Sequence, residues 1–318
     1  MRRGPEGMQA GIRSVIDIGS NSIKLRVARC LAGRIEVLLD TTEVVRLGKR
    51  TEAGRLREEA FQNGVRVVTE MVRRSRGMGA EPRLVGTMAL RLAGNTPDFL
   101  RTIRGRTGLD LMVLTGEEEA RLAWRGALDG LGQDGSCVVF DTGGGSTEFV
   151  FGSRAGIERT ESVAVGAVSL TERFFAADPV EAESINLARE YVRDLLRCST
   201  IQGVSSAVPP TVIGLGGGVV AMASVKLGLS DFMPLKLSGL RLTREDIEGQ
   251  MGRYAASTLD ERRRIRGLPA SRADLILGSA CIVLCAMEAL GTASFTVSIN
   301  GLRHGLLVEL FEADGLMP

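Results

Sequence analysis

Two short segments of this 318-residue chain end an apolar run with an aspartate and follow it with glycine and serine. The segment from Asp17 to Ser22 and the segment from Asp141 to Ser146 share the pattern D-x-G-x-x-S. A tight turn of this kind gathers backbone N–H groups into a concave surface that binds anions. Because a carboxylate repels a bare phosphate, the pattern favours a divalent cation between the two, or a water held by the Asp.

Each turn is preceded by an apolar strand pattern and followed by alternating apolar residues, which indicates a duplicated unit. Two such turns, one in each domain, are expected to face each other across a cleft and to hold a phosphoanhydride from both sides. The candidate phosphate-binding residues of the two turns are Asp17, Gly19, Ser20, Asn21, Ser22, Gly143, Gly144, Gly145 and Ser146. The alternative for either turn taken alone is an ordinary Gly-rich hairpin.

Glu148 lies in an otherwise apolar strand pattern that contains Phe149, Val150 and Phe151. A charge in such a strand must be paired or have a use. We expect Glu148 to complete a Mg²⁺ shell with Asp141 and waters, unless it lies on a solvated face of the strand. The corresponding position of the first repeat is Lys24, so the two repeats differ in charge. The predicted metal ligands are Asp17, Asp141 and Glu148.

Three consecutive acids, Glu117 to Glu119, open the helix that is predicted to follow Leu114. Thr115 and Glu118 have the spacing of a capping box, and acids in a first turn suit the helix dipole. Neither of these structural roles requires Glu119. It is therefore our candidate for the general base that activates an attacking water.

Two further segments could contact an anion. Arg303 is a cation at the start of the last predicted helix, where the helix dipole disfavours it, so an anionic partner would explain it. The glycine run from Gly214 to Gly218 matches neither the Rossmann nor the Walker A spacing, but the helix after it could still hold an anion through Gly216 and Gly217. The single His304 is more typical of a packed surface residue than of a catalytic acid.

Strand and helix patterns alternate along the chain, which predicts an α/β fold. Strands are expected from Ser14 to Gly19, from Arg34 to Leu39, near Val44 to Leu47 and from Cys137 to Asp141, with helices near 56–75, 97–106 and 117–131. The Gly-rich turn at 132–135 is the predicted boundary. The predicted division is a loose leader (1–13), a first domain (14–131, with a returning helix at 302–318) and a second domain (132–301).

Composition excludes several classes of protein. The 40 basic and 38 acidic residues give a net charge of +2, and one Trp with two Tyr offers few stacking platforms, so no nucleic-acid partner is expected. Five cysteines without C-x-x-C spacing indicate buried thiols in a reducing compartment. No apolar run approaches the roughly 20 residues of a membrane helix, so we expect a cytoplasmic protein without a membrane partner.

These motifs resemble those of the Ppx/GppA family of exopolyphosphatases and guanosine pentaphosphate phosphohydrolases. The matching segments, in family order, are VIDIGSNSIKL, VGTMALRLAGN, LTGEEEARLAWRGAL, VVFDTGGGSTEFV, VIGLGGG and SINGLRHGLL. The resemblance implies two actin-like (ribonuclease H-like) domains with an interdomain cleft, in the superfamily of sugar kinases, heat-shock chaperones and actin. It also implies the short two-domain form, without the C-terminal HD-type domains of longer members.

The resemblance further implies Mg²⁺-dependent release of terminal phosphate from inorganic polyphosphate by water, with Mn²⁺ as an alternative metal. By the same resemblance, Glu119 is the base, Asp141 and Glu148 are ligands of the cation and water, and Arg91 binds polyphosphate. Arg303 matches the arginine of the family's closing element. Gly218 stands where the family usually has Thr, which argues against strong nucleotide binding.

Two alternatives to polyphosphate hydrolysis remain open at this point. The same fold could hydrolyse guanosine pentaphosphate (pppGpp), or it could serve as an actin-like, nucleotide-gated structural protein. A homodimer is an expectation at the level of the family only.

Overall fold

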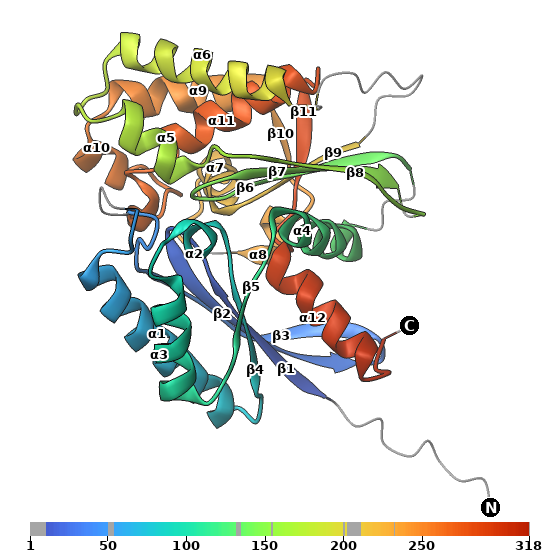
Figure 1. The fold of residues 1–318 in the computed structure, drawn as a ribbon. Helices are drawn as coiled ribbons and strands as arrows, with labels where there is room; N and C mark the ends of the chain where they lie inside the picture. Colours follow the sequence, from blue (N-terminus) through green and yellow to red (C-terminus); the bar gives the residue numbers. More distant parts are fainter. Residues whose placement is uncertain are drawn as a thin grey trace, which may run out of the picture. The chain divides into compact units, whose positions relative to one another are not determined.

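The computed structural model describes residues 11–49, 54–131, 135–153, 155–199, 201, 211–231 and 233–317. It divides into two compact units (Figure 1). The first consists of Met1–Thr115 and Arg303–Pro318, and the second is the continuous segment Gly116–Leu302.

The first unit contains a five-stranded sheet in the order β3-β2-β1-β4-β5. Its strands are β1 (Ile12–Ile18), β2 (Ser22–Leu31), β3 (Arg34–Val44), β4 (Pro82–Gly86) and β5 (Leu111–Val113). The first three form an antiparallel meander, and β4 and β5 then add in parallel. Val15, Ile16 and Ile18 are fully buried, as expected for a strand of β-branched residues in the middle of a sheet.

Helices α1 (Glu58–Gly77) and α3 (Thr96–Thr107) belong to the main core of the first unit, where Phe61 and Phe99 meet edge to face. The short α2 (Met88–Leu92) follows β4 directly. The last helix, α12 (Leu302–Ala313), buries Leu307 and Phe311 and returns to this unit. An ion pair between Arg13 of β1 and Asp314, just beyond α12, has an N–O distance of 2.7 Å.

The second unit contains a six-stranded sheet in the order β10-β11-β9-β6-β7-β8. Its strands are β6 (Cys137–Thr142), β7 (Thr147–Ser153), β8 (Gly156–Val163), β9 (Thr211–Leu215), β10 (Arg241–Thr243) and β11 (Ser294–Val297). Strand β6 pairs antiparallel with β7 and parallel with β9, as β1 pairs with β2 and β4. Both sheets therefore start from the same arrangement: a meander of three strands with a parallel strand beside its first.

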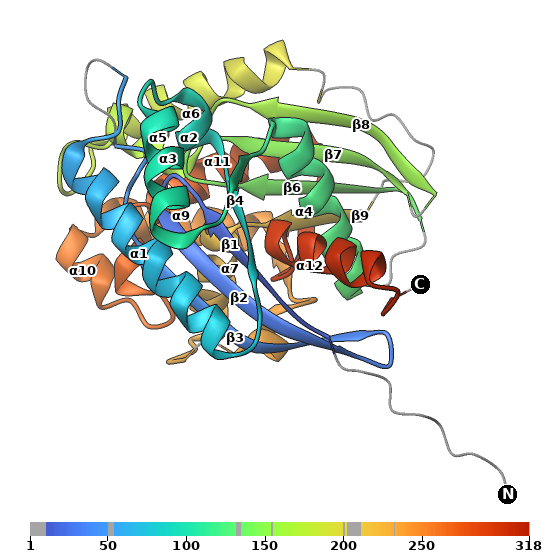
Figure 2. The ribbon, with the colours of Figure 1, turned by 60° about the horizontal axis from the view of Figure 1, so that its bottom comes forward.

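Helices cover both faces of the second sheet. On one face, Ala120, Ala123 and Trp124 of α4 (Gly116–Leu131) pack with Val139 and Val150 of the strands (Figure 2). The larger core on the other face includes α11 (Ile276–Ala289), whose apolar residues surround the helix. The remaining helices are α5 (Ala167–Phe174), α6 (Ala182–Cys198), α7 (Gly217–Leu227), α8 (Pro234–Leu237), α9 (Arg244–Ala256), α10 (Leu259–Arg263) and the 3₁₀ turn η1 (Ala270–Arg272).

The predicted α/β class is confirmed, but several boundaries differ from the prediction. The units divide between Thr115 and Gly116 rather than near 132, because α4 packs on the second sheet. The boundary turn at 132–134 and residues 1–10 of the expected leader lie outside the described residues, whereas β1 already begins at Ile12.

Two local predictions need correction. The expected strand near Val44 is the end of the long β3, which pairs with β2 up to Val44. His304 is buried rather than at the surface, with 4% exposure. In the part of the chain that the structure describes, no helix combines the length and the apolar character needed to cross a membrane.

Candidate active site

Three polar residues lie side by side across the second sheet: Asp141 on β6, Glu148 on β7 and Ser162 on β8. Residues directly opposite in antiparallel strands present their side chains on the same face, with Cβ atoms about 5 Å apart. Asp141 and Glu148 are thus two carboxylates in direct opposition, and Glu148 is only 5% exposed. Like charges in this arrangement destabilise a sheet, so a cation near both would stabilise it.

Backbone comes close to both oxygens of Asp141. A Cβ placed on Gly216 would lie 3.2 Å from Oδ1, and one placed on Gly301 would lie 3.5 Å from Oδ2. Gly216 also has a φ of +107°, which only glycine adopts readily. A side chain at either position would therefore narrow the space around the carboxylate.

The chemistry of these donors fits a hard cation. Within the described ranges, no group of three or more His, Cys, Asp and Glu residues could hold a metal ion. Zn²⁺ normally takes three or four such ligands, whereas Mg²⁺ is often held by one or two carboxylates and keeps several waters. Asp141 and Glu148 therefore suit Mg²⁺ better than Zn²⁺.

The start of α5 donates hydrogen bonds to the glycine turn beside Asp141. The carbonyls of Gly143 and Gly144 accept hydrogen bonds from the amides of Ala167 (3.0 Å) and Val168 (2.8 Å), and the Gly143 amide donates to the Ser146 carbonyl (2.9 Å). The amides of Gly144 and Gly145 have no acceptor in the part of the chain that the structure describes. Two consecutive donors beside a carboxylate can bind phosphate oxygens.

The turn of the first unit repeats this construction. The Gly19 amide donates to the Ser22 carbonyl (3.1 Å), and the Asn21 carbonyl accepts from the Val45 amide (3.0 Å), which follows β3. Asp17 is 7% exposed, and its Oδ1 has no hydrogen-bond partner within the described residues. Its other oxygen lies 3.8 Å from Nζ of Lys24, the residue opposite it on β2. Asp17 therefore already faces a cation of the chain.

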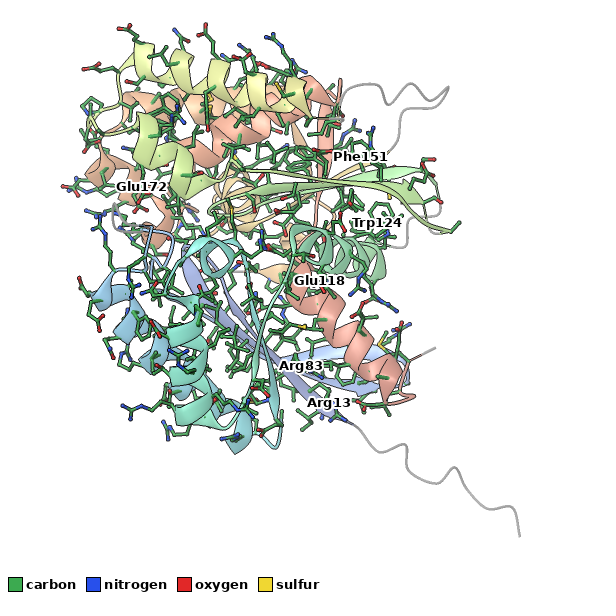
Figure 3. All side chains as sticks on the ribbon, in the orientation of Figure 1. Arg13, Arg83, Glu118, Trp124, Phe151 and Glu172 are labelled. Atoms are coloured by element: carbon green, nitrogen blue, oxygen red, sulfur yellow. The ribbon has the colours of Figure 1, made fainter. Side chains whose placement is uncertain are left out.

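Glu119 lies in the first turn of α4 and is 9% exposed. Side chains alternate along a strand, so Asp141 and Glu148 share a face with Val139 and Val150, and α4 covers that face (Figure 3, where Glu118 and Trp124 mark the helix). The packing of the second unit thus brings Glu119 to the side of the sheet that carries the two carboxylates.

The two predicted arginines have partners within the first unit. Arg91 donates from a terminal guanidinium nitrogen to the Leu114 carbonyl at 2.7 Å. Arg303 is paired with Asp40 of β3, which also accepts two hydrogen bonds from Arg26 of β2, at 2.6 and 2.9 Å. The anionic partner that the position of Arg303 called for is therefore supplied by the chain itself.

The charge balance of this cluster is visible in the pKa of Asp40. Burial alone would raise the pKa, but the charges of Arg303 and Arg26 outweigh that effect and hold it below its ordinary value. For Arg26, burial and the charge of Arg303 lower the pKa.

Sequence reasoning missed a third arginine. The guanidinium of Arg272 lies against the N-terminus of α7, where a Cβ on Gly217 would come within 2.1 Å of Arg272 Cζ. Burial lowers the pKa of Arg272 from its very high ordinary value. No local pattern links these two residues, because η1 and α7 meet only through packing.

Comparisons with known proteins agree with this architecture. The profile of the Ppx/GppA phosphatase family matches residues 26–313. The crystal structure of the Aquifex aeolicus member of that family has 30% identity and a TM-score of 0.82, over 96% of this chain and 99% of that one. An exopolyphosphatase structure from Cytophaga hutchinsonii has 25% identity and a TM-score of 0.86, over 97% of this chain and 100% of that one.

A curated relative from Photobacterium profundum is named as a guanosine-5'-triphosphate,3'-diphosphate pyrophosphatase. It is 29% identical over 300 residues, which cover 93% of this chain. The match spans only 59% of the length of that relative. Together with the two sheets described above, the family structures confirm the predicted α/β fold class.

Proposed function

Because the chain belongs to the Ppx/GppA phosphatase family, we propose that it hydrolyses the terminal phosphoanhydride bond of inorganic polyphosphate in a Mg²⁺-dependent reaction. The observation that carries this proposal is the opposed pair Asp141 and Glu148 beside the amides of Gly144 and Gly145, which find no acceptor among the described residues. It combines a place for a divalent cation with donors for phosphate oxygens.

Each group has a role in this proposal. Asp141 and Glu148 would hold Mg²⁺, which when bound would offset the negative charge of the phosphates. The amides of Gly144 and Gly145 would hold oxygens of the terminal phosphate. Glu119 would accept a proton from the attacking water as the water oxygen bonds to phosphorus and the bridging oxygen leaves with the shortened chain.

The direct test is phosphate release from long-chain polyphosphate with Mg²⁺, using wild type, Glu119→Gln and Asp141→Asn. Loss of a general base typically costs 10²- to 10⁴-fold in kcat, and we expect about that loss for Glu119→Gln, with KM nearly unchanged. Glu118→Gln, in the same helical turn, is the matched control and should keep near wild-type kcat. Full activity in both site variants would contradict the proposed roles.

A second substrate is favoured by the name of the Photobacterium relative. The same site would remove the terminal 5'-phosphate of pppGpp, because the bond broken is again a phosphoanhydride. Values of kcat/KM for polyphosphate, pppGpp and ATP at one Mg²⁺ concentration would rank the substrates, and replacement by Mn²⁺ would compare the metals. ATP-dependent polymerisation with negligible phosphate release would instead favour the structural-protein alternative.

A further inference from the structure

Ser162 on β8 contacts the candidate metal site without belonging to any of the motifs. It is the register partner of Glu148, and its hydroxyl donates a hydrogen bond to Glu148 Oε1 at 3.0 Å. Ser162 itself is exposed, whereas Glu148 is buried. A hydrogen bond to an ionised carboxylate is about twice as strong as one between neutral groups, so this contact can fix the orientation of Glu148.

The other side of Ser162 contacts the helix that carries Glu119. A Cβ placed on Gly116, the first residue of α4, would lie 3.0 Å from both Cβ and Oγ of Ser162. A distance this short leaves room for glycine only, unless Ser162 moves by a few tenths of an ångström. Ser162 therefore touches both the carboxylate on β7 and the start of α4.

We infer that Ser162 is a positioning residue of this site. Its hydroxyl holds one oxygen of Glu148 in place, and its close fit against Gly116 sets where α4, and with it Glu119, begins relative to the carboxylate pair. The catalytic consequence of this inference rests on the proposed function. The effect of Ser162 on metal binding follows from its contact with Glu148 alone.

The experiment compares Ser162→Thr with Ser162→Val. The two side chains have nearly the same shape and crowd Gly116 equally, but only Thr keeps the hydroxyl. Mg²⁺ and Mn²⁺ are titrated calorimetrically into the metal-free protein, and kcat and KM for polyphosphate are measured in parallel. Losing a hydrogen bond to a charged group predicts metal binding roughly 10-fold weaker or more in Ser162→Val than in Ser162→Thr.

The kinetic expectation separates positioning from a general structural effect. We expect kcat of Ser162→Val to fall roughly 10-fold relative to Ser162→Thr, with KM changed by less than about threefold. A purely structural role would lower the melting temperature of both variants alike and leave metal affinity per folded molecule the same.

A second variant tests the contact with α4. Gly116→Ala should weaken metal binding and lower kcat in the same direction as Ser162→Val, because the added methyl group displaces Ser162. Gly105→Ala is the matched control, because a Cβ at this helical position meets nothing within 4 Å.

Equal metal affinity in Ser162→Thr and Ser162→Val overturns the inference, as does a wild type that binds neither Mg²⁺ nor Mn²⁺. A wild type that binds metal but releases no phosphate from any substrate overturns the proposed function instead. The metal titrations still decide the role of Ser162 in that case.

Discussion

Each unit builds a row of three residues across three equivalent strands, and the middle residue of the row has opposite charge in the two units. The row of the first unit is Asp17, Lys24 and Thr42, and that of the second is Asp141, Glu148 and Ser162. In both, an aspartate is the next-to-last residue of the first strand and a hydroxyl residue lies on the third. Only the middle position differs in kind, with a cation in one unit and an anion in the other.

This difference assigns different tasks to similar backbones. In the first unit, the ammonium group of Lys24 lies 3.8 Å from Asp17, so the carboxylate has a permanent counter-charge. In the second unit, Asp141 faces a second carboxylate, Glu148, and a bound cation would be attracted to both. The residue opposite the aspartate, Lys24 or Glu148, thus distinguishes the two copies of the turn, and we expect the metal only in the unit that carries Glu148.

The largest predicted effect comes from giving the second unit the charge pattern of the first. Glu148→Lys would place a cation opposite Asp141 and remove a metal ligand, so we expect kcat to fall by about 10³-fold or more. Within the opposed pair itself, like charges are replaced by a cross-strand ion pair. The measurements are kcat and the melting temperature with and without Mg²⁺.

Mg²⁺ should raise the melting temperature of wild type but not of Glu148→Lys, because a ligand stabilises only the protein that binds it. Glu158→Lys, which makes the same change of charge at an exposed position of β8, is the control for net charge and should behave like wild type. A Mg²⁺-dependent stabilisation that survives in Glu148→Lys would place the metal elsewhere.

The next effect concerns whether Arg303 binds substrate or belongs to the first unit's framework. In Asp40→Asn, the guanidinium of Arg26, whose side chain is only 6% exposed, would lose the charge of Asp40. We expect the free energy of unfolding to fall by about 2 to 4 kcal/mol. If Arg303 acts only through Asp40, the double variant Asp40→Asn/Arg303→Met should have nearly the same free energy of unfolding as Asp40→Asn alone.

Steady-state kinetics on the same variants decides the alternative. A substrate-binding Arg303 predicts a raised KM for Arg303→Met and a normal KM for Asp40→Asn. Glu36→Gln, which breaks the exposed pair with Arg29 on the same two strands, should have little effect on either quantity.

The stability contributed by Asp40 depends on pH with a definite sign. Its pKa in the folded protein is below the value of about 3.9 expected when unfolded, so the unfolded state binds the proton more tightly. The contribution is complete above the unfolded pKa and is lost as the pH falls through the lower folded value. The difference in unfolding free energy between wild type and Asp40→Asn should therefore be full at pH 7 and shrink below about pH 4.

The smallest predicted effect is the reverse exchange in the first unit. Lys24→Glu would place a second carboxylate opposite the buried Asp17 and should lower the free energy of unfolding by about 1 kcal/mol. Lys24→Met removes the cation without adding an anion, so its free energy of unfolding should lie between those of wild type and Lys24→Glu. If added Mg²⁺ restores the stability of Lys24→Glu, one residue is enough to create a second cation site; no restoration would mean that the first turn lacks other requirements.

The sequence predicted the features that depend on local pattern. The two turns, the strands that contain Asp17 and Asp141 and the acidic start of α4 are all short-range signals. The partner of Arg303, the contact of Arg272 with Gly217 and the membership of α4 in the second unit all arise from packing between distant segments. The roles of Glu119 and Arg91, a homodimer and a cytoplasmic location stay predictions.

The return of α12 to the first unit has a consequence for synthesis on the ribosome. The second unit is one continuous segment, Gly116–Leu302, and can fold as it emerges. The first unit has its whole sheet translated early but receives the buried Leu307 and Phe311 only after the second unit is complete. The unit made first is thus finished last, and the surface that α12 will cover stays open to chaperones or to aggregation until Arg303 and the residues after it appear.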